Sequence, residues 1–425
     1  MHIEGHRSDQ SVGKKEIESR WKVDGEYKDG TLILDDDITL EMEAIKPWDY
    51  SSPISPYFHG EDKKNGRGIT LFEVIKKDHD IKKKKEIEIF KAKMAVLGGK
   101  FKNKKFERLE VQYCPCVWYS FIMGLDHPDE FFELKDYNFT CEVDDARLRI
   151  YARDTGDPLI GAELSVSVEP REPKDFRACL DYIGTLERVL SLIFCEFLTP
   201  QEIEGKIENK EVEVYSALSK KPIHKKKKRF EEIRPKGMVE NFRKDKFQRI
   251  LEKVEKDFEK FKGISFLYFW PMYFDDSKLE FLIYATALEG YCKNFHDSQV
   301  TLYRTLEIIQ EKYLDLFIPE NEEGSKAIDK LQKIIGNTDN SNEFKSVFGE
   351  FFECVRITRN WIAHAFYPKG QEDKIIHEPR HLNYANQVLR MILRLLLLHQ
   401  LCFEKEEIRN YRNCEYYVLN RLEIF

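Results

Sequence analysis

Apolar and polar residues alternate along most of the chain before Pro173, which is the pattern of half-buried β-strands. The clearest case is GTLILDDDITLEMEAI, residues 30–45, where alternation on both sides of an acidic turn predicts a hairpin. Gly, Asp and Pro punctuate the other predicted strands. These lie in GRGITLFEVI, KEIEIFKAKMAVLGG, RLEVQYCPCVWY, NFTCEVDDARLRIYA and GAELSVSVEP. The first part of the chain is therefore predicted to be β-rich.

After Pro173 the apolar residues recur at helical spacing, first in KDFRACLDYIGTLERVLSLIFCEFL. A strand is predicted in EVEVYSAL. Ser277 is predicted to cap the helix that begins directly after this serine, in KLEFLIYATALEGYCKNF. The aromatic stretch GISFLYFWPMYF is expected to be buried between domains. From Met238 onward helices are predicted at Met238–Lys262, Ser277–Phe295, Val300–Phe317, Lys326–Ile335, Ser341–Phe366 and Pro379–Phe403. Four or five helices with short links indicate a bundle.

Together these patterns predict an α+β protein with a β-rich domain at residues 1–235 and an all-α bundle at residues 236–425. A length of 425 residues fits two or three domains. Hydrophobic residues make up 42% of the chain and charged residues 34%, which is enough apolar material for a sizeable core and excludes a disordered chain.

Charge and cysteine content indicate which kind of protein this is and in which compartment it is expected. The net charge of −7 is not the overall signature of a nucleic-acid-binding protein. Nine cysteines, an odd number, fit reduced thiols in a cytoplasmic protein. The first twenty residues contain no apolar stretch typical of a signal peptide. The most apolar run, MILRLLLLHQLCF, is too short to span a bilayer, so no membrane partner is expected.

One segment departs from the overall acidity. Residues 220–249 carry 13 Lys and Arg against 4 Asp and Glu, centred on HKKKKRF. Lys225, Lys226, Lys227, Lys228 and Arg229 could contact the phosphate backbone of RNA, because such contacts need only positive charge within reach. A solvated linker between two domains would have the same composition, and both interpretations stay open.

Several motifs with known chemistry can be set aside. HEPRH, residues 377–381, has the letters of a zinc-protease motif, but Pro379 is expected to open a helix and leave His377 outside it. Cys114 and Cys116 in YCPCVW have no second cysteine pair at zinc spacing. Neither a phosphate-binding glycine loop nor a G-x-S-x-G elbow occurs. No metal or other cofactor is expected.

The stretch TRNWIAHAFYP, residues 358–368, ends the helix predicted at Ser341–Phe366. At about 100° per residue, an apolar stripe runs along this helix through Val355. Arg356, Asn360 and His364 lie about 100°, 140° and 180° away from Val355, so they stack on the opposite face. Arg359 lies nearer the stripe, at about 40°, where a long side chain still reaches outward.

This set of side chains suits phosphodiester chemistry. An imidazole transfers protons near neutral pH, a guanidinium holds a phosphate, and an amide orients either partner. RNA supplies its own nucleophile, the 2′-hydroxyl, and cleavage by it gives a 2′,3′-cyclic phosphate and a 5′-hydroxyl. On composition alone, Arg and His at this position could also be simple favourable charges at a helix C-terminus.

The sequence RNWIAH resembles the R-x4-6-H motif of HEPN-domain ribonucleases, with a polar residue directly after the Arg. The long apolar helix that follows, HLNYANQVLRMILRLLLLHQL, and the preceding ATALEGYCK are similar to the ApeA-like branch of that family. GTLILDDDITLEM and GRGITLFEVI resemble strands of the N-terminal domain of ApeA-type antiphage proteins.

The resemblance implies a metal-independent HEPN endoribonuclease in which Arg359, Asn360 and His364 are the catalytic residues. Arg356 is added as an RNA-binding residue from helical spacing alone, and Glu289 could support the site or be a plain surface carboxylate. The family further implies a homodimer or higher homo-oligomer through the HEPN domain, and a β-rich N-terminal domain that senses a phage-derived trigger. It also implies abortive infection as the outcome and RNA, with tRNA as the first candidate, as the substrate. The alternative is a HEPN module that only dimerises or binds nucleotides or nucleic acid.

Overall fold

The computed structural model describes residues 15–23, 26–35, 37–43, 57–82, 85–101, 104–113, 138–154, 162–195, 197–198, 200–216, 226–227, 244–336, 344–365 and 369–423. It has the α+β class predicted from the sequence, with a large antiparallel sheet before a helical region. Two compact units divide the chain. The first comprises Met1–Pro115, Asp144–Ile183 and Thr199–Lys220, and the second comprises Cys116–Val143, Gly184–Leu198 and Lys221–Phe425. The units are thus interleaved in sequence, whereas the sequence analysis placed one boundary after residue 235.

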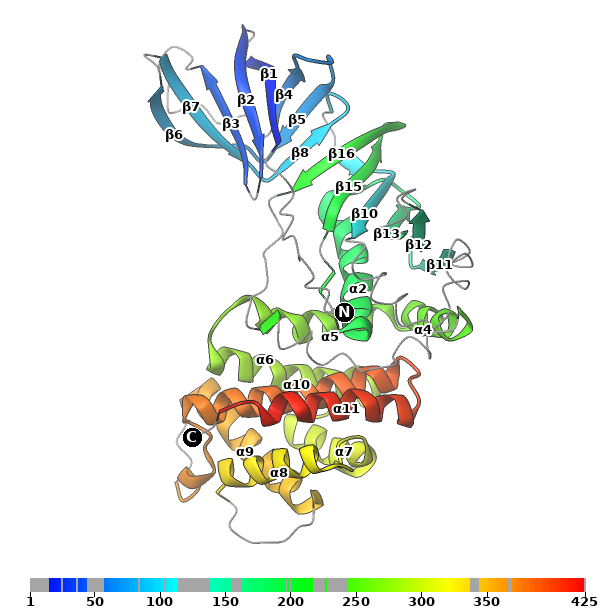
Figure 1. The fold of residues 1–425 in the computed structure, drawn as a ribbon, viewed down its shortest axis with the longest axis vertical. Helices are drawn as coiled ribbons and strands as arrows, with labels where there is room; N and C mark the ends of the chain where they lie inside the picture. The colour runs from blue at the N-terminus through cyan, green and yellow to red at the C-terminus, as the bar shows by residue number, and fades with distance from the viewer. Residues whose placement is uncertain are drawn as a thin grey trace, which may run out of the picture. The chain divides into compact units, whose positions relative to one another are not determined.

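The first unit is built on one antiparallel sheet, drawn mainly in blue, cyan and green in Figure 1. Its strands follow the order β12-β13-β10-β15-β16-β8-β5-β4-β1-β2-β3-β7-β6. Two short strands, β9 (Lys105–Phe106) and β14 (Lys174–Asp175), pair separately. The bounds are β1 Lys15–Val23, β2 Glu26–Leu34, β3 Ile38–Glu43, β4 Tyr57–Asp62, β5 Gly68–Phe72, β6 Ile75–Lys82, β7 Lys85–Ala92, β8 Met94–Leu97, β10 Arg108–Tyr113, β12 Ala146–Asp154, β13 Ala162–Pro170, β15 Pro200–Ile207 and β16 Lys210–Ser216.

The predicted hairpin is confirmed as β2 and β3, which pair antiparallel from Gly30↔Met42 to Leu34↔Ile38. Strand β1 was not predicted, because a serine interrupts the apolar alternation of its inward face. Ser19 is fully buried there, donating to Gly30 O at 3.0 Å and accepting from Trp21 Nε1 at 2.8 Å. A buried hydroxyl satisfied on both sides can stand where the alternation leads one to expect an apolar residue.

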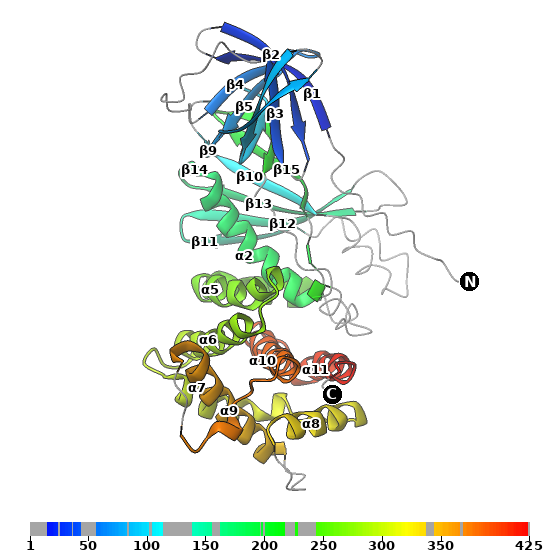
Figure 2. The ribbon, with the colours of Figure 1, turned by 90° about the vertical axis from the view of Figure 1, so that its left-hand side faces the viewer.

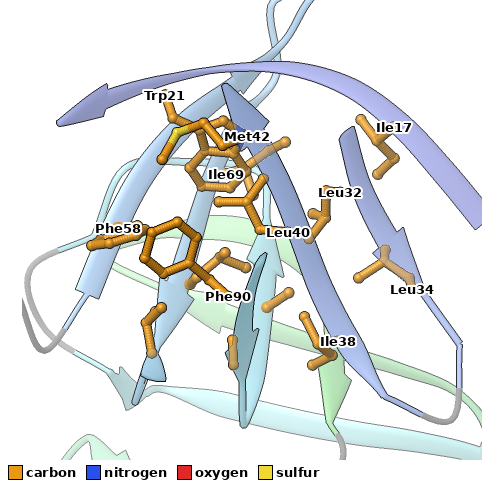
Figure 3. Packing of buried hydrophobic residues seen from close by; sticks show 14 of the residues in the cluster. Ile17, Trp21, Leu32, Leu34, Ile38, Leu40, Met42, Phe58, Ile69 and Phe90 are labelled. Carbon is orange, nitrogen blue, oxygen red and sulfur yellow. The ribbon is translucent and has the colours of Figure 1, made fainter. Parts of the chain in front are cut away.

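Trp21 lies in the middle of the hydrophobic cluster shown in Figure 3. Its ring is fully buried and lies directly over Gly60 on the neighbouring strand β4, where a Cβ would come within 2.6 Å of it. Only glycine fits under the indole at this position. The cluster also contains Leu32 and Leu40 from β2 and β3 on one side of β1 in the sheet, and Phe58 and Ile69 from β4 and β5 on the other, so apolar residues from both sides of Trp21 close this core.

The second unit contains strand β11 (Asn138–Val143) and a set of packed helices, seen from two directions in Figures 1 and 2. Helix α10 packs against α6 and α11, and α9 packs against α6, α7 and α8. Helix α2 (Phe176–Phe194) begins in the first unit and continues into the second. The remaining bounds are α4 Lys244–Lys256, α5 Phe258–Phe269, η3 Trp270–Tyr273, α6 Ser277–Phe295, α7 Leu302–Tyr313, η4 Leu314–Leu316, α8 Glu322–Ile334, α9 Phe344–His364, η5 Glu372–Lys374, α10 Pro379–Gln400 and α11 Lys405–Asn420.

Two details of the helix predictions were wrong. The helix expected to run through residue 257 is divided there into α4 and α5, because the backbone of Asp257 leaves helical geometry, with φ = −119° and ψ = 29°. The buried Asp257 carboxylate binds Lys253 at 2.6 Å and Lys260 at 2.7 Å across this break. The cap of α6 is Asp276, whose carboxylate accepts from the backbone N–H groups of residues 278 and 279. Ser277, predicted as the cap, is the first helical residue.

Helix α11 was missed, because its buried face is polar as well as apolar. Glu415 on α11 is 1% exposed and lies between two buried arginines of α10, at 3.4 Å from Arg390 Nη2 and 3.3 Å from Arg394 Nη1. Arg394 also donates to Leu192 O at 2.9 Å and contacts the Cys195 sulfur. The seven cysteines that the structure describes form no disulfide. Within the described ranges, none of the helices combines the length and the apolarity that a membrane crossing needs.

Candidate active site

Helix α9 carries the residues selected from the sequence and orients them as the helical spacing predicted. Its buried face includes Val347, Phe348, Phe351, Phe352, Cys354, Val355, Ile357 and Thr358. Arg356, Arg359 and Asn360 are half-buried, and His364, the last residue of the helix, is exposed. The polar face therefore points away from the helix's own core, at the end of α9.

Three side chains converge at this end of the helix. Arg359 Nη1 donates to Asn360 Oδ1 at 3.3 Å and lies 3.4 Å from His364 Nε2. Since a guanidinium has only donors, this second contact requires a lone pair on Nε2, and a neutral His364 then carries its proton on Nδ1. The contact joins the first and last residues of the R-x4-H spacing, which lie five positions apart. A phosphate could be held by the same guanidinium within reach of the imidazole.

Arg356 is held elsewhere, so the structure does not bring it into this group. Its Nε and Nη2 atoms donate to Glu353 at 2.8 and 2.7 Å in a two-pronged ion pair. The hydrogen bonds from Arg356 lower the pKa of Glu353 below its ordinary value. The spacing of an acidic residue three positions before a basic one on a helix could have indicated this pair from sequence.

The backbone ends α9 immediately after His364. Ala365 has φ = 50°, in the left-handed region that a residue with a Cβ seldom adopts. The chain then returns to the helix, where the Ile376 N–H donates to Thr358 Oγ1 at 2.9 Å in a buried contact. Such backbone strain persists where the surrounding structure fixes it. Ala365 therefore occupies the position after the helix end where the left-handed conformation usually favours glycine.

Replacing Ala365 with Gly is expected to raise the free energy of unfolding by about 1 kcal/mol, because glycine adopts positive φ without the steric cost. Urea unfolding of the two proteins measures this difference. The matched control is Ala363→Gly, two residues earlier and inside the helix, which should lower stability by about 0.5–1 kcal/mol. A loss of stability in both variants would contradict the assignment of strain to residue 365.

Two residues of helix α6 bear on the predicted site, one by contact and one as a candidate named from the sequence. Lys278 at the start of α6 places its ammonium 5.0 Å from the centre of the Trp361 ring, which is half-buried on α9. No sequence signal linked these residues, because only the packing of α6 on α9 brings them together. Glu289 on α6 accepts from Lys293 at 2.6 Å, one turn further along the same helix, and has the role of a surface ion pair.

Of HKKKKRF, the centre of the basic segment, the structure describes only Lys226 and Lys227. Lys226 is directed inward: its ammonium donates to Pro271 O at 3.0 Å, Phe274 O at 2.9 Å and Glu280 Oε2 at 2.7 Å. With three intramolecular acceptors, Lys226 fixes the segment to the helical unit and is not available to a phosphate. The predicted RNA-binding residues Lys225, Lys228 and Arg229 lie outside the described residues.

The zinc-protease letters HEPRH do not lie on one helix. Pro379 is the first residue of α10, with Glu378 in extended conformation before it, as predicted. His377 Nδ1 contacts the carbonyl of Ile375 at 3.1 Å. Among the residues that the structure describes, no group of three or more His, Cys, Asp and Glu side chains could hold a metal ion. Cys114 and Cys116 are outside the described ranges.

Comparison of the chain with protein-family models, with curated proteins and with solved structures found no match.

Proposed function

We propose that this protein is a metal-independent HEPN-type endoribonuclease whose reaction is carried out by Arg359, Asn360 and His364. The observation that supports it is the convergence of these three side chains at the exposed end of α9. Guanidinium, amide and imidazole groups together can bind a phosphodiester and move its protons. The resemblance of RNWIAH to the R-x4-6-H motif gives the same three residues.

In the proposed reaction His364 accepts the proton of an RNA 2′-hydroxyl through Nε2. The 2′-oxygen attacks the adjacent phosphorus, and the bond from phosphorus to the 5′-oxygen breaks. The leaving oxygen takes up a proton, so the products are a 2′,3′-cyclic phosphate and a 5′-hydroxyl with no water consumed. Arg359 leaves the imidazole for the phosphate and stabilises the charge that develops there. Asn360, already bound to Arg359, orients the guanidinium.

The two proton transfers need two groups, and each chain offers one imidazole at this place. A homodimer or higher homo-oligomer in which two α9 ends face one RNA strand would supply both. The HEPN and ApeA-like resemblance adds four points to the proposal. They are this dimeric arrangement, a cytoplasmic location, a phage-derived trigger sensed by the β-rich part, and abortive infection as the outcome. RNA is the substrate class, and tRNA is the first species to test.

The chemistry of the RNA ends tests the proposal directly. Purified wild type and His364→Ala are incubated with total RNA and with tRNA, and the fragments are examined for cyclic phosphate and 5′-hydroxyl ends. Ends of this kind that require His364 support the enzyme. Binding without any fragments would favour the alternative, a non-catalytic nucleic-acid or dimerisation module in which Arg359 stays bound to Asn360 and His364.

Glu353→Gln is expected to strengthen RNA binding about two- to fivefold. The ion pair holds the Arg356 guanidinium one turn before Arg359, and removing the carboxylate charge frees it for a phosphate. The slope of log Kd against log salt should then steepen by about 0.7, the value for one added contact to a single strand. Stability should fall by less than about 1 kcal/mol, because both side chains are about a third exposed.

The control is Glu350→Gln, which removes the same charge from an exposed position one turn earlier on α9. It should leave the salt slope unchanged. Equal effects of the two substitutions would mean that only the general charge of the helix acts, and that Arg356 makes no contact with RNA.

A further inference from the structure

Helix α5 has an outer face that is aromatic where a surface helix is usually polar. Its inner face is buried, with Phe258, Phe261, Ile264, Ser265, Tyr268 and Phe269. On the outer face Phe266 is 47% exposed and Trp270, at the start of η3, is 42% exposed. Tyr273 at the end of η3 is 37% exposed. These aromatics were expected to be buried between domains, and the structure leaves three of them at the surface.

The exposed rings are ordered as a stack. Phe266 and Trp270 lie one helical turn apart, with ring centres 5.4 Å apart and planes inclined by 29°. The Arg188 guanidinium lies 5.9 Å from the centre of the Phe266 ring and is itself fixed by a hydrogen bond to Ser265 at 3.1 Å. A Cβ added at Gly263, one turn before Phe266, would meet nothing within 4 Å. The stack therefore borders open space at this end.

One lysine of the basic segment is anchored beside the same face. Lys226 donates to the carbonyls of Pro271, within η3, and Phe274, directly after it, and its ammonium is 5.7 Å from the centre of the Phe274 ring. Lys226 is thereby fixed at residues that are sequence neighbours of Trp270 and Tyr273. Lys262, one turn before Phe266, adds a cation that is 37% exposed and pairs with the exposed Glu259 at 3.4 Å, a surface pair weak enough to be exchanged for a phosphate.

We propose that Phe266 and Trp270 form a stacking surface for the bases of single-stranded RNA, with Arg188 and Lys262 beside them for the backbone. Aromatic side chains bind bases of any sequence through their π faces, and adjacent cations follow the phosphates. The described cations beside the rings, the Arg188 guanidinium over Phe266 and the ammonium of Lys262, favour the bases and phosphates of single-stranded RNA over an apolar protein partner. The site rests on the proposed function and deepens it: α5 would bind substrate RNA at a second place, on a different helix from the α9 residues that cut it.

Binding is measured with the full-length protein and a fluorescein-labelled 2′-O-methyl oligouridine of about 12 nucleotides. This probe lacks the attacking hydroxyl, so the result does not depend on whether the protein cleaves RNA. Phe266→Ala and Trp270→Ala should each weaken binding about tenfold, in the range of one lost base stack, without changing the salt slope. Trp270→Phe should retain most of the affinity, because a smaller aromatic ring still stacks.

The matched control is Tyr417→Ala, since Tyr417 is 50% exposed and also lies near a guanidinium, that of Arg421 at 5.6 Å. It should bind like wild type. A duplex of the same length should bind these variants and wild type equally, because its bases are not accessible. Unchanged affinity of both Phe266→Ala and Trp270→Ala for the single strand would overturn the proposal. If these variants instead dissociate an oligomer in sedimentation, the face is a contact with a second copy.

Discussion

Replacing His364 with Ala is expected to reduce RNA cleavage by about 10²- to 10⁴-fold, the usual loss when a general acid–base group is removed. The reason lies in the geometry at the end of α9. His364 is exposed there and contacts the Arg359 guanidinium at 3.4 Å, so the substitution removes the imidazole without opening the core. The rate of appearance of cyclic phosphate ends measures the effect.

Three further measurements separate catalysis from folding. Arg359→Ala should lower cleavage to a similar extent and should also weaken binding, since it removes the proposed phosphate ligand. His377→Ala, an exposed imidazole outside the site, should cleave like wild type. A chelator should change neither rate nor product ends. Wild-type cleavage by the His364 variant, with its thermal unfolding unchanged, would rule out the proposed role of this residue.

Glu415→Gln is expected to lower the free energy of unfolding by about 3–5 kcal/mol, the cost of breaking a buried ion pair from one side. The carboxylate is the shared partner of Arg390 and Arg394, and all three side chains are almost completely buried. Glutamine keeps the size of the side chain but removes its charge. The two guanidiniums would then face each other without an anion, while Arg394 would keep its contacts with the Leu192 carbonyl, the Cys195 sulfur and the Tyr411 ring.

Urea unfolding gives the difference, and the comparison is Glu406→Gln on the same helix. Glu406 also pairs with an arginine, Arg409, at 2.9 Å, but its side chain is 78% exposed. That pair should contribute about 1 kcal/mol or less. If the two variants lost similar amounts of unfolding free energy, burial of the Glu415 ion pair would not make it more important for stability.

The sequence predicted most of the regular elements, because their burial follows a simple period. The hairpin of β2 and β3 and the full extent of α6 were found from apolar spacing alone. The sequence also indicated that the polar face of α9 lies opposite its apolar stripe, since the helical angle between Val355 and His364 does not depend on the rest of the fold. It missed the strands β1, β4, β6 and β15 and the helix α11. In β1 and α11 the reason is that Ser19 and Glu415 occupy buried positions through specific polar partners.

Which polar residues act together was decided by tertiary contacts and by side-chain reach. Helical spacing grouped Arg356 with Asn360 and His364, whereas in the structure Arg359 contacts both of them and Glu353 holds Arg356. The basic run gave no sign that Lys226 faces inward, because its acceptors come from residues 45 to 54 positions away. The sequence by itself determined the class of each element and the residue types at the end of α9. Only the tertiary structure decided the partners of Lys226 and Glu415, because their opposite groups lie on other elements and come within about 3 Å only when the chain folds.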